Sequence, residues 1–257
     1  TLKQRKNFVE IKNARSDFVS LSHLGEEALQ LGIEVKGERT YNVLDPVPKI
    51  FIGKKQPYNQ FIADMRKKLT SIGFQEMKTS MIVQEFYNFD VLFQPQNHPA
   101  RQWTDSYQLK QPTHGKLPDK KIVDKIKAGH ETGGLAGGTG WGYDWSADIA
   151  SRLMPTAHGT AMDARQLCEG VEFPRKYFVI NRCFRPDVLD ATHLVEFNQL
   201  DAFMVGKDLS FRSLLFILKQ LASVIAGAED VKFTTGYFPF TEPSCELSIK
   251  HPQLGWM

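Results

Sequence analysis

The stretch FVINRCFRPDVLDATHLVEFNQLDAF, residues 178–203, decides the fold of this chain. Two runs rich in β-branched and aromatic residues, 176–184 and 194–205, flank a polar connection over 185–193. Runs of this composition on either side of a polar segment predict two antiparallel strands. The sequence therefore places a long hairpin with an unusually long loop at the centre of the fold.

Polar side chains lie at both ends of that loop and along the second predicted strand: Arg185, Asp187, His193, Glu196, Asn198, Gln199 and Asp201. If these side chains face a core, burying each one costs roughly several kcal/mol of free energy unless it is paired or bound to a ligand. On a solvent-exposed strand they cost nothing. The residues alone thus leave two interpretations open, a ligand site or an exposed polar face.

Amphipathic segments precede and follow the hairpin. Residues 57–72 place Phe61, Met65, Leu69 and Ile72 on one helical face, and residues 207–228 do the same with Leu214, Leu218, Leu221 and Ile225. Shorter helices are expected from near Ser22, over 146–153 and over 160–168, and strands over 74–83, 231–240 and 242–249. This order predicts an α+β fold, with an antiparallel sheet flanked by helices.

The remaining segments predict loops and a division of the chain. Residues 113–129 are polar and basic, so we expect them to be exposed, and the seven glycines within 129–145 predict a loop. Several prolines and glycines follow residue 36. We therefore expect a basic N-terminal extension and linker over 1–40 and one domain over 41–257.

Composition excludes several classes of protein. Of 257 residues, 42% are hydrophobic and 24% charged, as in a globular protein. The net charge of +3 is too small for a broad nucleic-acid footprint, so any RNA contact must be local. Three cysteines without a CxxC pair argue against a disulfide framework and a structural zinc site. No apolar run reaches the roughly 18–20 residues of a membrane span, and the N-terminus lacks the apolar core of a signal peptide. We expect a cytoplasmic protein.

The hairpin resembles the second signature motif of the class II aminoacyl-tRNA synthetases, in which an arginine ends one strand and the returning strand carries residues for adenine and amino acid. The segment DATHLVEF, residues 190–197, is similar to the phenylalanyl-tRNA synthetase alpha-subunit family in its archaeal and eukaryotic branch. Four more stretches agree with that family in the same order: GKKQPYNQFIADMRKKLTSIGFQEM (53–77), FDVLFQPQNHPARQWTDSYQL (89–109), TGWGYDW (139–145) with HGTAMDAR (158–165), and GYFPFTEPSCEL (236–247).

This resemblance covers about residues 40–257 and implies a class II synthetase fold. It implies an enzyme that activates phenylalanine with ATP and Mg²⁺ and transfers it to tRNA(Phe). The implied partner is a beta subunit, in a tetramer of two alpha and two beta chains, with no membrane involved. A non-catalytic, synthetase-like paralogue acting as a binding or regulatory module is the alternative.

The resemblance also implies a role for each matching residue. Arg185 would hold the α-phosphate and the amino-acid carboxylate, a bidentate task suited to guanidinium, and His193 would approach the ATP phosphates. Asp187 would lie near the adenine amino group and Phe197 would stack on adenine. His158, Thr160, Gln199 and Asp201 would bind the substrate ammonium. Phe238 and Phe240 would meet the phenyl ring edge-to-face. The resemblance leaves metal ligands unknown.

The chain departs from the family pattern in several places. The family usually has His at Gln56 and Asn198, Pro at Lys78, Glu at Asp187 and Asp201, and Gly at Ala202. Each Asp keeps the negative charge but loses one methylene of reach. The family continues into a third motif, GxGxxR, beyond the point that matches Met257. We therefore expect a C-terminally incomplete fold that is inactive alone, from either a fragment or a degenerate relative.

Overall fold

A computed structural model of the protein describes residues 9–10, 20–32, 53–102, 104–134, 137–190, 193–251 and 255–257. The chain divides into two compact units, Thr1–Lys54 and Lys55–Met257. In the first, β1 (Val9–Glu10) pairs antiparallel with β2 (Ser20–Leu21), and α1 (His23–Gln30) follows. Ser22 is the N-cap residue of α1, which confirms the predicted start of that helix. The boundary predicted after residue 40 lies outside the described residues.

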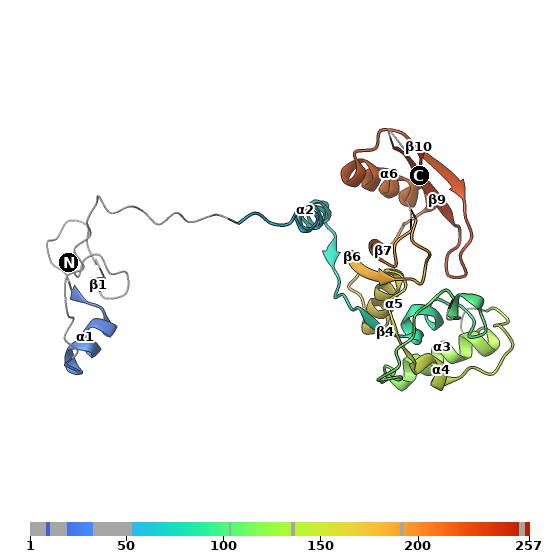
Figure 1. Ribbon diagram of the computed structural model, residues 1–257, viewed down its shortest axis with the longest axis horizontal. Coiled ribbons are helices and arrows are strands. Elements are labelled where there is room, and N and C mark those ends of the chain that lie inside the picture. The colour runs from blue at the N-terminus through green and yellow to red at the C-terminus, as the bar shows by residue number, and fades with distance from the viewer. Residues whose placement is uncertain are drawn as a thin grey trace. The chain divides into compact units, whose positions relative to one another are not determined.

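The predicted hairpin is the longest strand pair of the second unit as described (Figure 1). Strand β6 (Arg175–Phe184) pairs antiparallel with β7 (Glu196–Val205) along its whole length, from Arg175 opposite Val205 to Phe184 opposite Glu196. On the other side of β6, the short strand β3 (Gln75–Glu76) pairs in parallel. The central hairpin is therefore confirmed, with one parallel neighbour that the sequence did not predict.

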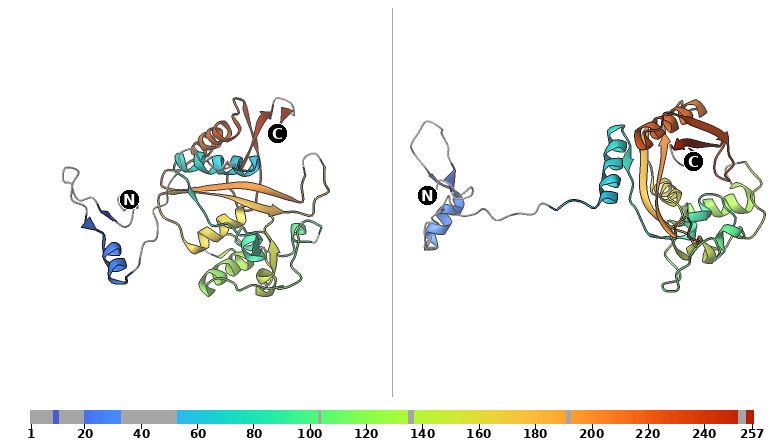
Figure 2. Two further views of the ribbon diagram at one scale, coloured as in Figure 1. Left: turned by 60° about the vertical axis from the view of Figure 1, so that its left-hand side comes forward. Right: turned by 45° about the horizontal axis from the view of Figure 1, so that its top comes forward.

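Helices cover both faces of this hairpin (Figure 2). On one face Tyr177 and Val179 pack with Ala161 and Met162 of α5 (Thr160–Glu169). On the other face, alternate hairpin residues such as Phe178 and Ile180 pack with α2 (Pro57–Ser71) and α6 (Phe211–Ala226). Because successive strand residues point to opposite faces, one hairpin supplies two cores. The predicted α+β class, a sheet flanked by helices, is confirmed.

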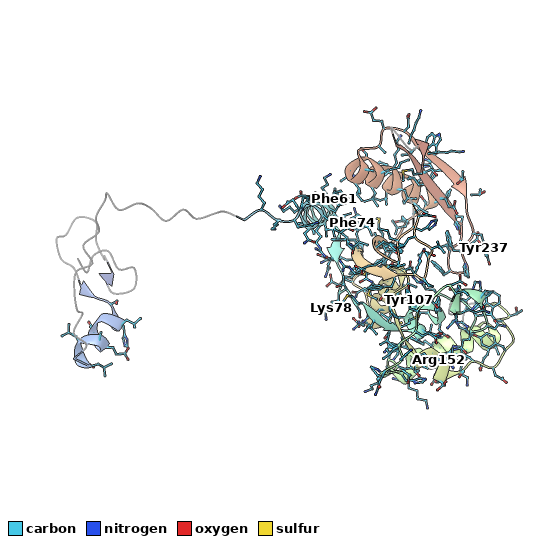
Figure 3. The ribbon with its side chains drawn as sticks, in the orientation of Figure 1. Phe61, Phe74, Lys78, Tyr107, Arg152 and Tyr237 are labelled. Atoms are coloured by element: carbon cyan, nitrogen blue, oxygen red, sulfur yellow. The ribbon has the colours of Figure 1, made fainter. Side chains whose placement is uncertain are left out.

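The two long helices begin and end where the sequence indicates. The Gln56 side chain accepts the Asn59 N–H at 2.8 Å at the start of α2, and Pro57 occupies its first turn. A capping box between Ser210 and Ser213 begins α6. One residue on each predicted apolar face is exposed, since Phe61 is 52% and Leu214 39% exposed. Phe61 is labelled on α2 in Figure 3.

A second layer lies on the α5 side of the hairpin. Strand β4 (Ile82–Gln84) pairs antiparallel with β5 (Leu153–Pro155), next to the π-helix η2 (Phe86–Asp90), the 3-10 turn η3 (Pro99–Arg101), α3 (Lys120–Thr132) and α4 (Ala147–Ser151). The single strand predicted over 74–83 is therefore wrong. Its two ends join different sheets, β3 to the hairpin and β4 to β5.

The polar segment 113–129 also differs from its prediction. Much of it belongs to α3, where Ile122, Val123 and Ile126 pack against a core that contains Phe86 and Trp145. Apolar residues one turn apart bury one face of an otherwise polar helix. The expectation of a wholly exposed segment was therefore wrong for Leu117 and for the buried face of α3.

The C-terminal part is a small antiparallel sheet in the order β10–β9–β8. Its strands are β8 (Val231–Thr235), β9 (Cys245–His251) and β10 (Gly255–Trp256). Val231 lies opposite Ile249, so the predicted final strand pair is confirmed. None of the helices in the described ranges combines the length and the apolar character needed to cross a membrane.

Candidate active site

The predicted site residues of β7 share the hairpin face that packs against α5. Phe197, Gln199 and Asp201 lie opposite Cys183, Asn181 and Val179 of β6, respectively. Val179 belongs to the core formed with α5. Since alternate residues share a face, all three side chains project toward the start of α5 rather than toward α2 and α6.

Asp201 is held at the N-terminal end of α5. Thr160 Oγ1 donates a hydrogen bond to Asp201 Oδ2 at 2.6 Å, and the Ala202 N–H donates to Oδ1 at 2.9 Å. A Cβ added to Gly159 would lie 3.0 Å from Asp201 Cβ, so glycine permits this close approach. The structure thus brings together Thr160 and Asp201, two of the residues predicted for the ammonium.

His158 presents a buried acceptor in the same region. Its Nε2 donates to the Asn88 carbonyl at 2.8 Å, which places the ring hydrogen on Nε2. Burial lowers the pKa of His158 to about 4; the hydrogen bond to the Asn88 carbonyl and the charge of Asp201 oppose this shift, and the charge of Arg185 adds to it. The ring is therefore neutral near pH 7. Within the described residues, its buried Nδ1 has no hydrogen-bond partner, so it can accept from a ligand.

Arg185 and Phe197 lie together beside this cluster. The Arg185 guanidinium carbon is 5.1 Å from the centre of the Phe197 ring, and Nε donates to the Ala157 carbonyl at 3.0 Å. The backbone N–H of Ala157 in turn donates to Asn88 Oδ1 at 3.1 Å. A cation over an aromatic face is stabilised by the ring quadrupole. The predicted phosphate-binding and adenine-stacking residues are therefore neighbours.

His193 and Asp187 lie in the hairpin loop, apart from these contacts. Asp190 accepts hydrogen bonds from the His193 N–H at 2.8 Å and from Nδ1 at 2.9 Å. This hydrogen bond and the charge of Asp190 raise the pKa of His193, to which Asp187 adds. The His193 side chain is 57% exposed. It is accordingly presented to solvent by a loop carboxylate that the sequence analysis did not single out.

Phe238 and Phe240 form a pair in the connection between β8 and β9. Their ring centroids are 6.0 Å apart at an interplanar angle of 38°. Their exposed fractions are 42% and 44%. Among the described residues, no hydrogen bond or ring contact joins this pair to the hairpin face. The structure thus brings the two aromatics together.

Asp163 is a residue of this cluster that the sequence analysis missed. It lies one helical turn after Thr160 on α5, is buried, and its carboxyl group hydrogen-bonds with Asp201. Burial, then the charge and hydrogen bond of Asp201, raise its pKa to about 9. The i, i+3 spacing of Thr160 and Asp163 is the signal that could have found it, because such residues share a helix face.

A buried ion network supports the segment that positions His158. Arg101 Nη1 lies 3.2 Å from Glu85 Oε2 and 3.0 Å from Asp90 Oδ2. Asp90 also accepts from Trp145 Nε1 at 2.5 Å. Asp90 and Asn88 belong to the same π-helix, η2, so the network anchors the turn whose carbonyl orients His158.

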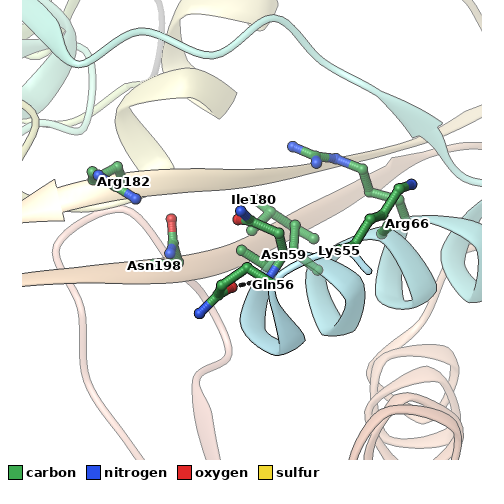
Figure 4. A pocket seen from close by; sticks show the side chains of 9 residues that line it. Lys55, Gln56, Asn59, Arg66, Ile180, Arg182 and Asn198 are labelled. Atoms are coloured by element: carbon green, nitrogen blue, oxygen red, sulfur yellow. Dashed lines mark hydrogen bonds between the residues drawn. The ribbon is translucent and has the colours of Figure 1, made fainter. Parts of the chain in front are cut away.

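A groove of about 610 Å³ lies on the opposite face of the hairpin (Figure 4). Arg182 in this groove pairs with Glu196 at 2.8 Å, and Asn198 Nδ2 donates to Tyr58 Oη at 2.6 Å. Its lining residues are Lys55, Gln56, Asn59, Ile62, Ala63, Arg66, Ile180, Arg182 and Asn198. Two departures from the family pattern, Gln56 and Asn198, thus lie on the face away from Asp201.

The side chains of two further departures from the family pattern, Lys78 and Ala202, lie outside the cluster around Asp201. Lys78 is exposed between β3 and β4 (Figure 3), and the Ala202 side chain packs in the core with α2 and α6. In the part of the chain that the structure describes, no group of three or more His, Cys, Asp and Glu residues is placed to hold a metal ion.

Comparison with known proteins places these features in a family. Residues 40–257 match the family described as tRNA synthetases class II core domain (F). The phenylalanine–tRNA ligase alpha subunit of Thermococcus kodakarensis is 59% identical over 220 residues, 85% of this chain and 44% of the relative. That of Thermococcus onnurineus is 51% identical, over 99% of this chain and 55% of the relative. The chain thus spans about half the length of these relatives.

The solved structure of pyrrolysyl-tRNA synthetase from Desulfitobacterium hafniense aligns with 77% of this chain and 57% of its own. Its sequence identity is 14% and its TM-score 0.48, a similarity too low to bear on function.

Proposed function

The chain belongs to the class II tRNA synthetase core-domain family, and on that premise we propose that it is the catalytic part of a phenylalanine–tRNA ligase alpha subunit. It activates phenylalanine with ATP and transfers the product to tRNA(Phe). The observation that carries this proposal is the position of Arg185 and Phe197 beside two acceptors, the buried His158 Nδ1 and the partly buried Asp201 carboxylate. A cation-binding pocket next to an arginine suits an amino acid with an ammonium and a carboxylate.

In activation, the phenylalanine carboxylate attacks the α-phosphate of ATP and pyrophosphate leaves. Catalysis of such a step is mainly positioning and charge neutralisation. Arg185 neutralises charge on the reacting carboxylate and phosphate, held in place by Ala157 and Phe197. A fixed guanidinium stabilises the transition state without reorganising during the reaction.

The ammonium of phenylalanine binds at the start of α5. Asp201 supplies the negative charge, and His158 Nδ1 supplies a neutral acceptor. The Thr160 hydroxyl donates to Asp201, which leaves its oxygen lone pairs as acceptors. Gln199 is next along the same face of β7, with its Oε1 3.9 Å from the buried Cys183 Sγ. These four groups can together accept the three hydrogens of an ammonium.

The aromatic ring of the substrate is assigned to Phe238 and Phe240. Their tilted rings, 6.0 Å apart, offer faces and edges to a third ring. Each aromatic pair formed with the substrate contributes about 0.5–1.5 kcal/mol beyond burial of the ring.

The remaining components follow the same proposal. ATP enters with Mg²⁺ as its counterion, because magnesium usually keeps water and substrate phosphates among its ligands. His193 approaches the phosphates from the exposed loop, and Asp187 the adenine amino group. A beta subunit, in a tetramer of two alpha and two beta chains, and tRNA(Phe) complete the assembly, which we assign to the cytoplasm. The partner is supported by relatives whose name is that of an alpha subunit.

Phenylalanine-dependent ATP–pyrophosphate exchange tests this function in the complete protein assembled with its partner. We expect Arg185→Ala to lower kcat by about 100-fold or more, because it removes a contact to developing charge. Arg182→Ala is the matched control, since Arg182 lies on the other hairpin face in an exposed pair with Glu196. We expect it to keep the rate within about twofold.

Phe240→Leu should behave differently from Arg185→Ala. A lost ring contact weakens ground-state and transition-state binding alike, so KM for phenylalanine rises while kcat is retained. Equal and small effects of Arg185→Ala and Phe240→Leu on exchange would refute the site. They would leave the non-catalytic paralogue as the better interpretation.

A further inference from the structure

Two carboxyl groups share the buried end of the candidate amino-acid site. Asp163 and Asp201 hydrogen-bond to each other, from α5 and β7 respectively. Asp163 is 7% exposed, and within the described residues its Oδ1 is buried without a hydrogen-bond partner. Two ionised carboxylates this close repel each other strongly at a buried site, so the pair holds a proton.

The hydrogen bonds indicate which carboxyl group carries that proton. Asp201 accepts from Thr160 Oγ1 at 2.6 Å and from the Ala202 N–H at 2.9 Å. Donors favour the ionised form of the group they contact. Within the described residues Asp163 has only Asp201 as a hydrogen-bond partner, so Asp163 holds the proton and donates it to Asp201.

The other titratable groups around the pair are committed elsewhere or neutral. His158 is neutral near pH 7, and burial raises the pKa of the Cys183 thiol to about 11. Arg185 donates to Ala157 and lies over Phe197. On η2, Asp90 pairs with Arg101, and burial raises the pKa of Tyr87, which keeps the phenol neutral.

On α5, Arg165 pairs with Glu169. Burial raises the pKa of the Cys168 thiol to about 11, so this group is also neutral near pH 7.

We propose that Asp163 is a second carboxylate for the substrate ammonium, and that phenylalanine binding displaces the proton that Asp163 and Asp201 share. This inference rests on the proposed function. Before binding, the pair carries one negative charge. Afterwards two carboxylates and one ammonium also sum to one negative charge, and one proton has passed from Asp163 to solvent. No covalent bond to the substrate forms in this step.

If an ammonium replaces the shared proton, the ligands that release this proton are those that carry an ammonium. The unpartnered Oδ1 of Asp163 gains a donor only when the ligand brings one. A ligand with an ammonium but no carboxylate, such as phenylalaninol, should therefore still release the proton. A ligand with the carboxylate but no ammonium, such as 3-phenylpropanoate, should release none, and leaves the pair in its protonated state.

Isothermal titration calorimetry tests this in the complete protein assembled with its partner. Titrations of L-phenylalanine in buffers of different ionisation enthalpy report the number of protons released. We expect about one proton per phenylalanine near pH 7 for the wild type, and near zero for Asp163→Asn. The affinity of the wild type should rise by up to about tenfold per pH unit between about pH 6.5 and 8, relative to Asp163→Asn. The comparison with Asp163→Asn cancels the effect of the ionisation of free phenylalanine, because that effect is common to both proteins.

Glu169→Gln is the matched control, because it neutralises an exposed carboxylate on the same helix, in an ion pair with Arg165. Glu169→Gln should release as many protons per bound phenylalanine as the wild type. Phenylalaninol and 3-phenylpropanoate, titrated into the wild type, give a test that needs no variant to fold.

Three outcomes separate the two proposals. Proton release with phenylalanine and phenylalaninol, but not with 3-phenylpropanoate, supports the shared proton. A wild type that catalyses phenylalanine-dependent exchange but releases no proton overturns this inference alone, as does Asp163→Asn with unchanged release. A wild type without phenylalanine-dependent exchange overturns the proposed function and this inference together.

Discussion

Desolvation has opposite effects on two residues at the start of α5. Burial raises the pKa of the Asp163 carboxyl to about 9 and lowers that of the His158 imidazole to about 4. In both cases a low-dielectric environment disfavours the charged form. The charged form is the deprotonated carboxylate for Asp163 and the protonated imidazolium for His158. Near neutral pH the two groups are therefore uncharged.

Asp163 should make the free energy of unfolding fall as pH rises. Its pKa is about 9 in the folded protein against an ordinary value of 3.8, so between these values only the folded chain holds the proton. Because the unfolded state binds fewer protons, stability decreases by up to about 1.4 kcal/mol per pH unit in this window. His158 has the opposite slope, but only between about 4 and 6.5.

Urea denaturation of the wild type and Asp163→Asn, from about pH 6.5 to 8.5, isolates the contribution of Asp163. We expect the variant to gain stability relative to the wild type across this range. A constant difference between the two curves would contradict the raised pKa.

At the scale of elements, the π-helix η2 connects the buried ion network to the site. Desolvation raises the pKa of Glu85, and the charge and hydrogen bond of Arg101 oppose that rise. Arg101 Nη1 also lies 3.0 Å from Asp90 Oδ2, and Arg101 Nε donates to the Pro95 carbonyl at 3.0 Å. The Arg101 guanidinium thus binds η2 at Asp90, in the same π-helix as the Asn88 carbonyl that accepts from His158.

Arg101→Met should therefore destabilise the fold strongly. Removing the cation leaves Glu85 and Asp90 buried without their partner, which costs about 3–5 kcal/mol. Arg165→Met is the matched control, since Arg165 forms an exposed pair with Glu169 at 2.7 Å and should cost less than about 1 kcal/mol. Chemical denaturation measures both, and similar losses for the two variants would refute the role of the network.

At the scale of the whole molecule, the candidate site is confined to one compact unit. Every residue assigned to the site, from His158 to Phe240, belongs to Lys55–Met257, and Thr1–Lys54 forms a separate unit. Units with their own contacts can fold and act independently.

Deleting residues 1–54 from the complete protein should therefore leave phenylalanine-dependent ATP–pyrophosphate exchange within about twofold of the wild type. The deletion keeps Gln56 and Pro57, which begin α2. Exchange kinetics with a parallel melting curve check this. A loss of exchange without a loss of stability would show that the first unit contributes to activation.

The local pattern of the sequence was enough for the hairpin and its main helices. Strands β6 and β7, helices α2, α5 and α6, and the pair β8–β9 follow from alternation, helical spacing and capping residues, which act over a few neighbours. The order of motifs also led to the prediction that the hairpin carries site residues, among them Arg185, Phe197 and Asp201. These features needed no information about distant contacts.

Tertiary structure alone decided the features that depend on which distant segments meet. The segment 74–83 divides between two sheets because β6 and β5 lie in different places, and α3 is buried on one face because Phe86 and Trp145 cover it. The hydrogen on His158 Nε2 and the proton on Asp163 depend on the Asn88 carbonyl and on Asp201, 70 and 38 residues away in sequence. Burial and charge act through space, so the protonation states of His158 and Asp163 are decided only after folding.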